Sequence, residues 1–284
     1  LSLIFIIISL SLLFFKGLNF GVDFKGGTLI EIRIENSIHS VSKVRDVFGN
    51  SNLTNLTVKN FGNDKDYIIK FEKQNLDNPE FINNLKKNVS KSFPDINFRR
   101  VENVGPKVSS ELLKSGIIAI SLSLAAMLFY IWIRFEWQFS LGAIAALFHD
   151  VIITLGIFSL LSLEINLSIV AAVLTIVGYS MNDTVVIFDR VRDNLRKYAD
   201  INIFELTNQS INETLSRTIL TSVTTLLALL SIFFLGGEIL RGFSLAMILG
   251  VIIGTYSSIY IANPILVKLN VDHNTVVKKD EEKN

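Results

Sequence analysis

Asp183 is an acidic residue inside a stretch that is otherwise apolar enough to lie in lipid. The run SIVAAVLTIVGYSMNDTVVIF carries Asn182, Asp183 and Thr184 side by side, and Asp183 lies six residues before the charged residue Asp189. A carboxylate at the centre of a membrane helix costs roughly 2.5 to 3.5 kcal/mol on insertion scales, so it usually faces a partner or a watery path. Such acids build proton relays, because a small rearrangement of their surroundings can add or remove the proton.

Arg217 is the candidate partner of Asp183. Consecutive membrane helices run antiparallel, and if the helix that carries Arg217 begins near Ile211, both side chains lie six residues, about 9 Å, inside the same ends of their helices. Thr221 and Thr225 follow Arg217 at i+4 and i+8, so the face that carries the cation is lined with hydroxyls. The acid can change its charge and the arginine cannot. We therefore predict a proton-coupling pair, with a permanently ionised clasp between two helices as the alternative.

Asp150 is a further acid inside an apolar block. Its neighbour His149 is expected to point to a different face of the helix, so the two are not expected to act as one pair. We interpret Asp150 as a second, supporting polar site, as we do Asn182 and Thr184, which offer hydrogen bonds beside Asp183. His149 is expected only to satisfy a buried hydrogen bond.

The sequence has no pattern typical of a hydrolytic or redox enzyme. Its three histidines are scattered, it has no cysteine, and neither a Gly-x-Ser-x-Gly motif nor a Walker lysine is present. We therefore predict no enzyme activity, no metal and no cofactor, and we expect the energy for any work to come from an ion gradient. The net charge of +1 gives no indication of a nucleic-acid partner.

The elements that position these residues are predicted membrane helices. Half of the 284 residues are hydrophobic, and crossing about 30 Å of hydrocarbon takes roughly 20 helical residues. Five apolar blocks qualify: 115–133, 139–163, 168–188, 218–235 and 243–267. A sixth block, 1–15, is short; we interpret it as a first span without its N-terminal start, with the apolar region of a signal peptide as the alternative. In the last block, Gly250 and Gly254 indicate close packing, and Asn263 with Pro264 indicates a kink.

Basic residues of the short loops predict the orientation, since Lys and Arg mark the cytoplasmic side. One side carries Arg134, Arg190, Arg192, Arg196, Lys197 and Arg217. The short loops of the other side carry only Arg241, so both termini are predicted to be cytoplasmic. The predicted organisation is a transmembrane helix at 1–15, an extracytoplasmic domain at 16–105, transmembrane helices two to six at 106–267 with a cytoplasmic connector at 190–216, and a cytoplasmic tail at 268–284.

The large outer loop has the pattern of a folded domain. Apolar residues alternate in TLIEIRI, LTVKNF, YIIKFE and INFRRVENV, with helical patterns at SVSKVRDVF and PEFINNLKKNVSKSF between them. The predicted order is strand, helix, strand, strand, helix, strand, which is that of a ferredoxin-like α+β sandwich. Without cysteine, such a domain must be held by its own apolar core.

Two stretches with glycine connect this domain to the membrane helices. GLNFGVDFKGGT contains Gly26 and Gly27, and VENVGPKVSSEL contains Gly105 and Pro106. A phosphate-binding loop is not favoured, because the glycine pair precedes a strand and does not open a helix. We interpret both stretches as tight junctions, and both a rigid anchor and a hinge fit the pattern.

These motifs resemble those of the SecD/SecF family of bacterial protein-export membrane subunits, which belongs to the resistance-nodulation-division superfamily. The resemblance rests on GLNFGVDFKGGT after the first span, VENVGPKVSSEL before the second, HDV in the third and GYSMNDTVVIFDRVRDN in the fourth, and it covers nearly the whole chain in order. The motif of the fourth span is long and specific. Met181 stands where the family usually has a β-branched residue, and Asp193 where a glutamate is common.

The resemblance implies a subunit of the bacterial cytoplasmic (inner) membrane that uses the proton gradient, together with SecD, to promote preprotein translocation. The partners it implies are SecD, the SecYEG translocon and the translocating preprotein, with YajC and YidC as further candidates. Two other functions fit the same residues: a proton-antiporting half-transporter for a small molecule or lipid, and a passive scaffold for the translocon. Only the scaffold predicts no dependence on the protonation of Asp183.

Overall fold

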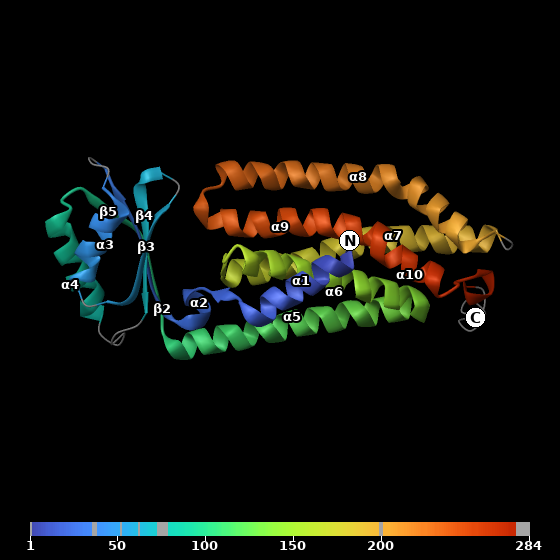
Figure 1. The fold of residues 1–284 in the computed structure, drawn as a ribbon, viewed down its shortest axis with the longest axis horizontal. Helices are drawn as coiled ribbons and strands as arrows, with labels where there is room; N and C mark the ends of the chain where they lie inside the picture. The colour runs from blue at the N-terminus through green and yellow to red at the C-terminus, as the bar shows by residue number, and fades with distance from the viewer. Residues whose placement is uncertain are drawn as a thin grey trace. The chain divides into compact units, whose positions relative to one another are not determined.

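The computed structural model describes residues 2–35, 39–51, 53–61, 63–72, 79–198 and 201–276. The chain divides into two compact units. Residues 20–117 form an α/β unit, and residues 1–19 together with 118–284 form a helical unit. Figure 1 shows the elements of both units.

The α/β unit is built on one antiparallel sheet. Along the chain its elements are α2 (Val22–Lys25), β2 (Gly27–Ile34), α3 (Val41–Gly49), β3 (Thr54–Phe61), β4 (Asn63–Glu72), α4 (Pro79–Ser92) and β5 (Ile96–Val104). The four strands β2 to β5 pair in the order β3-β4-β2-β5. Helices α3 and α4 lie on one face of this sheet (Figure 1), so that face is the covered one.

Apolar side chains at every second position of the strands build the core of the α/β unit. Ile30, Ile32 and Ile34 of β2 are almost completely buried, and Ile30 lies opposite Ile69 of β4 and Val101 of β5. Because alternate side chains of a strand point to the same face, these residues share the face that the helices cover. The helices add Val44, Phe48, Leu85 and Val89 to this cluster. A single apolar layer therefore holds the unit together.

The glycine pair at the start of β2 is fixed by its packing. Gly26 and Gly27 have φ angles of 78° and 138°, which L residues with a side chain rarely adopt. A Cβ on Gly27 would lie 2.7 Å from the carbonyl oxygen of Phe71 on the neighbouring strand. At the second junction, a Cβ on Gly105 would meet no atom within 4 Å, and Pro106 is the first residue of α5 (Pro106–Arg134). The backbone of the first junction therefore leaves no space for a side chain at Gly27, whereas the second junction has space for one at Gly105.

The helical unit is dominated by long apolar helices. Its elements, with the short strands, are α1 (Ser2–Phe15), β1 (Asn19–Phe20), α5 from Ile118 onward, α6 (Trp137–Leu160), β6 (Glu164–Ile165), α7 (Leu167–Lys197), α8 (Ile203–Leu235), α9 (Glu238–Ser257), the π-helical turn η1 (Ser258–Ala262) and α10 (Asn263–Lys268). Five helical segments of the described chain are long and apolar enough to cross a membrane: α5, α6, α7, α8 and the run from α9 to α10. α1 is apolar but shorter. The chain is therefore a polytopic helical membrane protein, as its hydropathy predicted.

The polar connector expected at 190–216 is mostly helical. α7 continues to Lys197, and α8 already begins at Ile203. The prediction that the second helix begins near Ile211 is therefore wrong. This segment continues the two helices beyond their apolar blocks. Its polar residues recur at helical spacing, and it contains no proline that would end a helix.

Polar side chains join these two helical extensions. Arg190 Nε donates to Glu213 Oε2 at 2.5 Å. Asn194 Nδ2 donates to the same carboxylate oxygen at 3.0 Å and to Ser210 Oγ at 2.9 Å. The ends of α7 and α8 that meet at their short connection are thus fixed to each other by hydrogen bonds.

The C-terminal residues also pack against the helical unit. Val271 and Val276 are buried in its main apolar cluster, and Nδ1 of His273 lies 2.7 Å from the carbonyl oxygen of Leu195. Of the tail expected at 268–284, residues 277–284 lie outside the described residues. The part that is described belongs to the packed structure.

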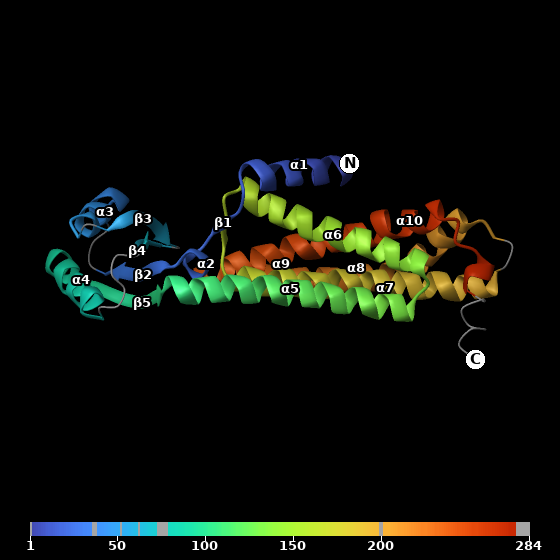
Figure 2. The ribbon, with the colours of Figure 1, turned by 90° about the horizontal axis from the view of Figure 1, so that it is seen from below.

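α1 lies against α6 (Figure 2). Lys16 Nζ donates to the carbonyl oxygen of Leu160 at 2.7 Å, and Ser159 Oγ donates to the carbonyl oxygen of Gly17, also at 2.7 Å. The C-terminal end of α6 and the residues that follow α1 are therefore joined by hydrogen bonds to backbone carbonyls.

Small residues let α9 approach α7 closely. A Cβ on Gly250 would lie 2.2 Å from Cγ1 of Ile176, and a Cβ on Gly254 would lie 3.0 Å from Cβ of Ser180. The two glycines therefore mark a close-packed face, as their spacing predicted.

The π-helical turn η1 follows directly after α9. The Asn263 side chain donates to the carbonyl oxygen of Ser258 at 2.7 Å. Pro264, the next residue, has no N–H with which to continue the regular ladder of backbone hydrogen bonds. The irregular turn thus lies where the sequence predicted a kink, and such turns are a known cause of helix bending.

We predict that Gly250→Ala destabilises the helical unit by about 1 to 3 kcal/mol, because the added methyl group forces Ile176 or a helix to move. The measurement is the midpoint of thermal unfolding of the full chain in detergent, followed by circular dichroism. Gly178→Ala is the matched control: Gly178 is a helical glycine whose added Cβ meets nothing within 4 Å, so the midpoint should stay or rise. Equal midpoints for the two variants would contradict the close packing of α9 on α7.

We predict that Gly27→Ala weakens the pairing of β2 with β4 by about 1 to 3 kcal/mol, since the backbone oxygen of Phe71 cannot rotate away and φ is unfavourable for alanine. The expected result is faster amide hydrogen exchange in both strands of the full chain. Gly105→Ala serves as the control, because its Cβ has free space. Unchanged exchange in the Gly27 variant would mean that the junction tolerates movement.

Candidate functional site

Asp183 is buried in α7, with only 2% of its surface exposed. Its Oδ2 atom has no hydrogen-bond partner among the described residues. The hydroxyl of Thr184 turns to the backbone and donates to the carbonyl oxygen of Ser180 at 3.2 Å, while Asn182 is exposed. A buried polar atom without a partner costs free energy, so Oδ2 is an open position for a proton or a water molecule.

Asp183 and Arg217 lie equally far from the connection between α7 and α8. Asp183 is 14 residues before Lys197, and Arg217 is 14 residues after Ile203, which is about 21 Å of helix in each case. The equal depth expected from the sequence is kept, although both helices are longer than expected. Arg217 acts on Asp183 electrostatically, but no salt bridge joins the two side chains in the part of the chain that the structure describes.

Arg217 is exposed on the surface of the chain. The hydroxyl of Thr221 donates to the carbonyl oxygens of Arg217 and Thr218, both at 3.0 Å, and is therefore occupied within its own helix. Thr225 is half-buried. The structure thus brings the acid and the cation to matching depths, but leaves the guanidinium group on the outer surface of this chain.

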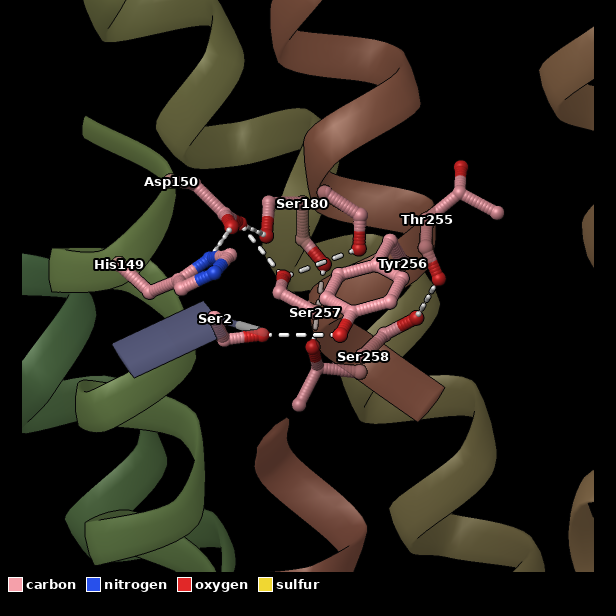
Figure 3. A network of polar contacts seen from close by, with 10 residues as sticks. Ser2, His149, Asp150, Ser180, Thr255, Tyr256, Ser257 and Ser258 are labelled. Atoms are coloured by element: carbon pink, nitrogen blue, oxygen red, sulfur yellow. Dashed lines mark hydrogen bonds and ion pairs between the residues drawn. The ribbon is translucent and has the colours of Figure 1, made fainter. Parts of the chain in front are cut away.

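Asp150 lies near the middle of α6, at the centre of a buried polar network (Figure 3). Its Oδ1 atom is 2.8 Å from Nδ1 of His149. Its Oδ2 atom accepts a hydrogen bond from Ser180 of α7 at 2.5 Å and another from Ser257 of α9 at 2.8 Å. The side chains of Asp150 and His149 are 1% and 2% exposed. Three helices therefore meet at one carboxylate.

The prediction that His149 and Asp150 do not pair is wrong. Neighbouring residues leave a helix about 100° apart, but the imidazole is long enough to turn sideways and reach the adjacent carboxylate. The ring of His149 also stacks beside Tyr256 of α9, with 6.1 Å between the ring centroids (Figure 3). His149 is therefore part of the network around Asp150.

Ser180 and Ser257 are residues of the site that the sequence analysis missed. Ser180 precedes Asp183 by three residues and so shares its helix face. Ser257 follows Gly254 by three residues, on the face by which α9 approaches α7. These two spacings are the signals that could have identified both hydroxyls.

Ion pairs secure the ends of the same helices. Arg134 Nη2 lies 2.9 Å from Asp189 Oδ1, and both side chains are partly exposed. Arg192 Nη2 lies 3.2 Å from Glu136 Oε1, and both of these side chains are only 4% exposed. The sequence did not indicate the second pair, because its members come from different segments without a shared motif. These charges form ion pairs, and the two carboxylate oxygens of Glu136 make no hydrogen bond within the described residues.

The chemistry that the buried residues can perform is proton binding. Asp183, Asp150 and His149 can each take up or release a proton, whereas Arg217 keeps its charge. Within the described ranges, no group of three or more His, Asp or Glu side chains could hold a metal ion.

Comparison with known proteins identifies the family of the chain. Residues 84–272 match the family model of the protein export membrane protein SecD/SecF, C-terminal, and residues 11–38 match that of the SecD/SecF GG motif. The protein translocase subunit SecF of Rickettsia bellii is 49% identical over 250 residues, which is 87% of this chain and 82% of that protein. The subunit of the same name from Cereibacter sphaeroides is 44% identical over 264 residues, 90% of this chain and 82% of that protein.

Two solved structures are also similar. The crystal structure of SecDF from Thermus thermophilus, a translocon-associated membrane protein, matches with a TM-score of 0.85 and 35% identity over 94% of this chain. A SecDF structure in a super-membrane-facing form matches with a TM-score of 0.69 and 34% identity over the whole chain. This chain spans 37% and 38% of those two longer chains. From the family models and the extent of its identity with these relatives, the chain belongs to the SecD/SecF family of protein export membrane proteins.

Proposed function

We propose that this chain is an accessory subunit of the bacterial Sec protein-export machinery, and that it uses the proton gradient to promote preprotein translocation. The observation that carries the proposal is the buried Asp183, which has an unpartnered carboxylate oxygen and lies at the same helix depth as Arg217. Relatives that are named protein translocase subunit SecF support the Sec assignment.

The proposed coupling begins with a proton that binds to Asp183. Arg217 stays charged, so a change at Asp183 alters the force between α7 and α8. One elementary charge that crosses 100 mV releases about 2.3 kcal/mol, which is enough to bias a two-state equilibrium roughly fifty-fold. We also propose Asn182, Thr184, Thr221, Thr225 and Asp150 as supporting polar groups along α7, α8 and α6. No nucleophilic or redox step is required, so the subunit is a transport component and not an enzyme.

We infer that the α/β unit is a ferredoxin-like domain outside the membrane. The strand order β3-β4-β2-β5, with two helices on one face, supports the fold. The proposed topology has six spans, of which α1 belongs to the first, and both termini in the cytoplasm of a bacterium with the chain in its inner membrane. The basic residues near the α7–α8 connection support this orientation. Movement would reach the outer domain through Gly26, Gly27, Gly105 and Pro106.

The proposed partner of the helical unit is SecD. Arg217 is exposed in this chain, and a guanidinium group that faces lipid is costly. The most apolar stretches of α5 and α8 are only 6% and 17% buried, so both helices leave large surfaces for lipid or a partner. A SecD subunit on the face of α8 would cover Arg217. The SecYEG translocon, the preprotein, YajC and YidC are further proposed partners, which rest on the family alone.

We predict that Asp183→Asn leaves the protein inserted and assembled but abolishes the gain in export that the proton gradient provides, because the amide cannot exchange a proton. The measurement is preprotein translocation into inverted membrane vesicles, with and without a proton gradient. Asp189→Asn is the matched control, since the same change is made in the same helix at a partly exposed, ion-paired position. Full gradient-dependent gain in the Asp183 variant would leave a passive scaffold as the function.

Arg217→Lys is expected to reduce the gradient-dependent gain severalfold. Lysine keeps the positive charge but lacks the planar group with several fixed donors. The same vesicle assay measures the effect, and Arg196→Lys, at a surface pair with Asp193, is the control that should behave as the wild type. Unchanged export in the Arg217→Lys variant would mean that a diffuse positive potential is sufficient.

A further inference from the structure

The network around Asp150 has the geometry of a binding site. We propose that His149 and Asp150 form a second proton-binding site inside the helical unit and take up one proton as a single unit. Its use in export rests on the function proposed above, whereas the binding of the proton does not. The site is separate from Asp183, because it lies on α6 and is completed by hydroxyls from α7 and α9.

The hydrogen bonds of Asp150 fit both of its charge states. When the carboxylate is ionised, Oδ2 accepts from Ser180 and from Ser257. The Ser257 hydroxyl has a second acceptor, the carbonyl oxygen of Gly254, at 3.1 Å. When Oδ2 carries a proton, that proton can be donated to Ser257 Oγ, and the hydroxyl hydrogen of Ser257 turns to the Gly254 carbonyl. The carboxylate of Asp150 can therefore change its charge while Oδ2, Ser180 and Ser257 keep hydrogen-bond partners.

His149 provides a second position for the same proton. Its Nε2 atom is buried and has no hydrogen-bond partner within the described structure. With a hydrogen on Nδ1 that faces Asp150, Nε2 has a free lone pair and can accept a proton, which turns an imidazole and a carboxylate into an ion pair. Whether the proton lies on Nε2 or on Oδ2, the net charge of the pair changes from −1 to 0. Two groups that share a proton in this way titrate together.

Few other charges face the pair. On the elements packed around it, the titratable groups away from the helix ends are Tyr256 of α9, Tyr260 of η1, and Tyr179 and Asp183 of α7. The other charged residues of these helices lie toward their ends: Arg241 near the start of α9, and those from Asp189 to Lys197 in the C-terminal part of α7. Tyr256 also exchanges a hydrogen bond of 2.8 Å with the hydroxyl of Ser2 in α1, and Tyr179 points to Ser222 of α8 at 3.5 Å. In the described chain no lysine or arginine forms an ion pair with Asp150. The imidazole of His149 is therefore the neighbouring group that becomes a counter-charge when it takes up a proton.

Ser180 connects this site to the helix that carries Asp183. Its hydroxyl donates to Asp150, its carbonyl oxygen accepts from Thr184, and its Cβ lies against Gly254 with little free space. A proton on Oδ2 of Asp150 weakens the hold of the carboxylate on Ser180 and Ser257. Because α6, α7 and α9 meet there, the same proton changes how firmly the three helices are joined.

The test is a titration of the His149 ring nitrogens by NMR in the full chain, reconstituted in lipid nanodiscs. The chain has three histidines, so the double variant His39→Gln/His273→Gln leaves His149 as the single label for ¹⁵N-histidine. We expect the ring nitrogen signals of His149 to shift with a single midpoint between about pH 5 and about pH 9, whether the proton lies on Nε2 or on Asp150 Oδ2. Signals that stay constant throughout this range would overturn the proposal, without any need for a further variant.

Asp150→Asn in the same background should remove this titration or move its midpoint by at least one pH unit, a tenfold change in proton affinity. Asp189→Asn, an equivalent change in the partly exposed C-terminal part of α7, should leave the titration in place. Ser180→Ala and Ser257→Ala each remove one donor to the carboxylate and should give smaller shifts. An identical titration with and without the Asp150 carboxylate would mean that His149 acts alone and that there is no shared site.

The same measurements separate this inference from the proposed function. If the wild-type protein gains nothing from the gradient and the His149 titration still depends on Asp150, the proton site stands and the export role fails. If the gradient-dependent gain is lost in Asp183→Asn while His149 shows no titration, the export role stands and the second site fails.

Discussion

A carboxylate in the hydrocarbon region of a membrane must find its hydrogen bonds inside the protein, because there is no bulk water to supply them. Asp150 meets this requirement with three donors from three helices. The donors Ser180 and Ser257 come from α7 and α9, so the mutual positions of α6, α7 and α9 follow from this one group. The arrangement also depends on Gly254, since a larger residue there would push Ser180 away.

Close packing through small residues recurs across the helical unit. A Cβ on Gly142 of α6 would lie 2.8 Å from the carbonyl oxygen of Ala262 at the end of η1, and a Cβ on Gly156 would lie 2.3 Å from Oγ of Ser9 in α1. Helices in lipid gain little from the hydrophobic effect when they associate, so close contact and hydrogen bonds between them must supply the stability. α6 is therefore held on two sides by positions where only glycine fits.

Asp183 and Arg217 are charged residues of the helical unit that form no ion pair with each other among the described residues. The carboxylate has an oxygen without a partner among the described residues, and the guanidinium group lies on the surface. In contrast, the charges near the ends of α7 are paired with Arg134, Glu136 and Glu213. The carboxylate oxygen without a partner and the exposed guanidinium group are the physical reasons for proposing proton coupling and a partner subunit at this pair. The nearby Asp150 network, which is fully bonded at its carboxylate, shares α7 with it.

The sequence by itself determined the class of protein, the order of the elements and the depth of the candidate residues. Apolar blocks of bilayer length predict spans, alternation in segments such as β2 predicts strands, and a constant rise per residue makes Asp183 and Arg217 equally deep even after the helix bounds change. Only the tertiary structure decided which side chains meet: that His149 reaches Asp150, that Ser180 and Ser257 bind the same oxygen, and that Arg217 is exposed. Depth follows from position along one helix, but contact depends on the rotation of each helix about its axis and on side-chain rotamers. A helix that is apolar on nearly all sides, such as α6, does not encode that rotation in its own residues, so it is set by helices far away in the sequence.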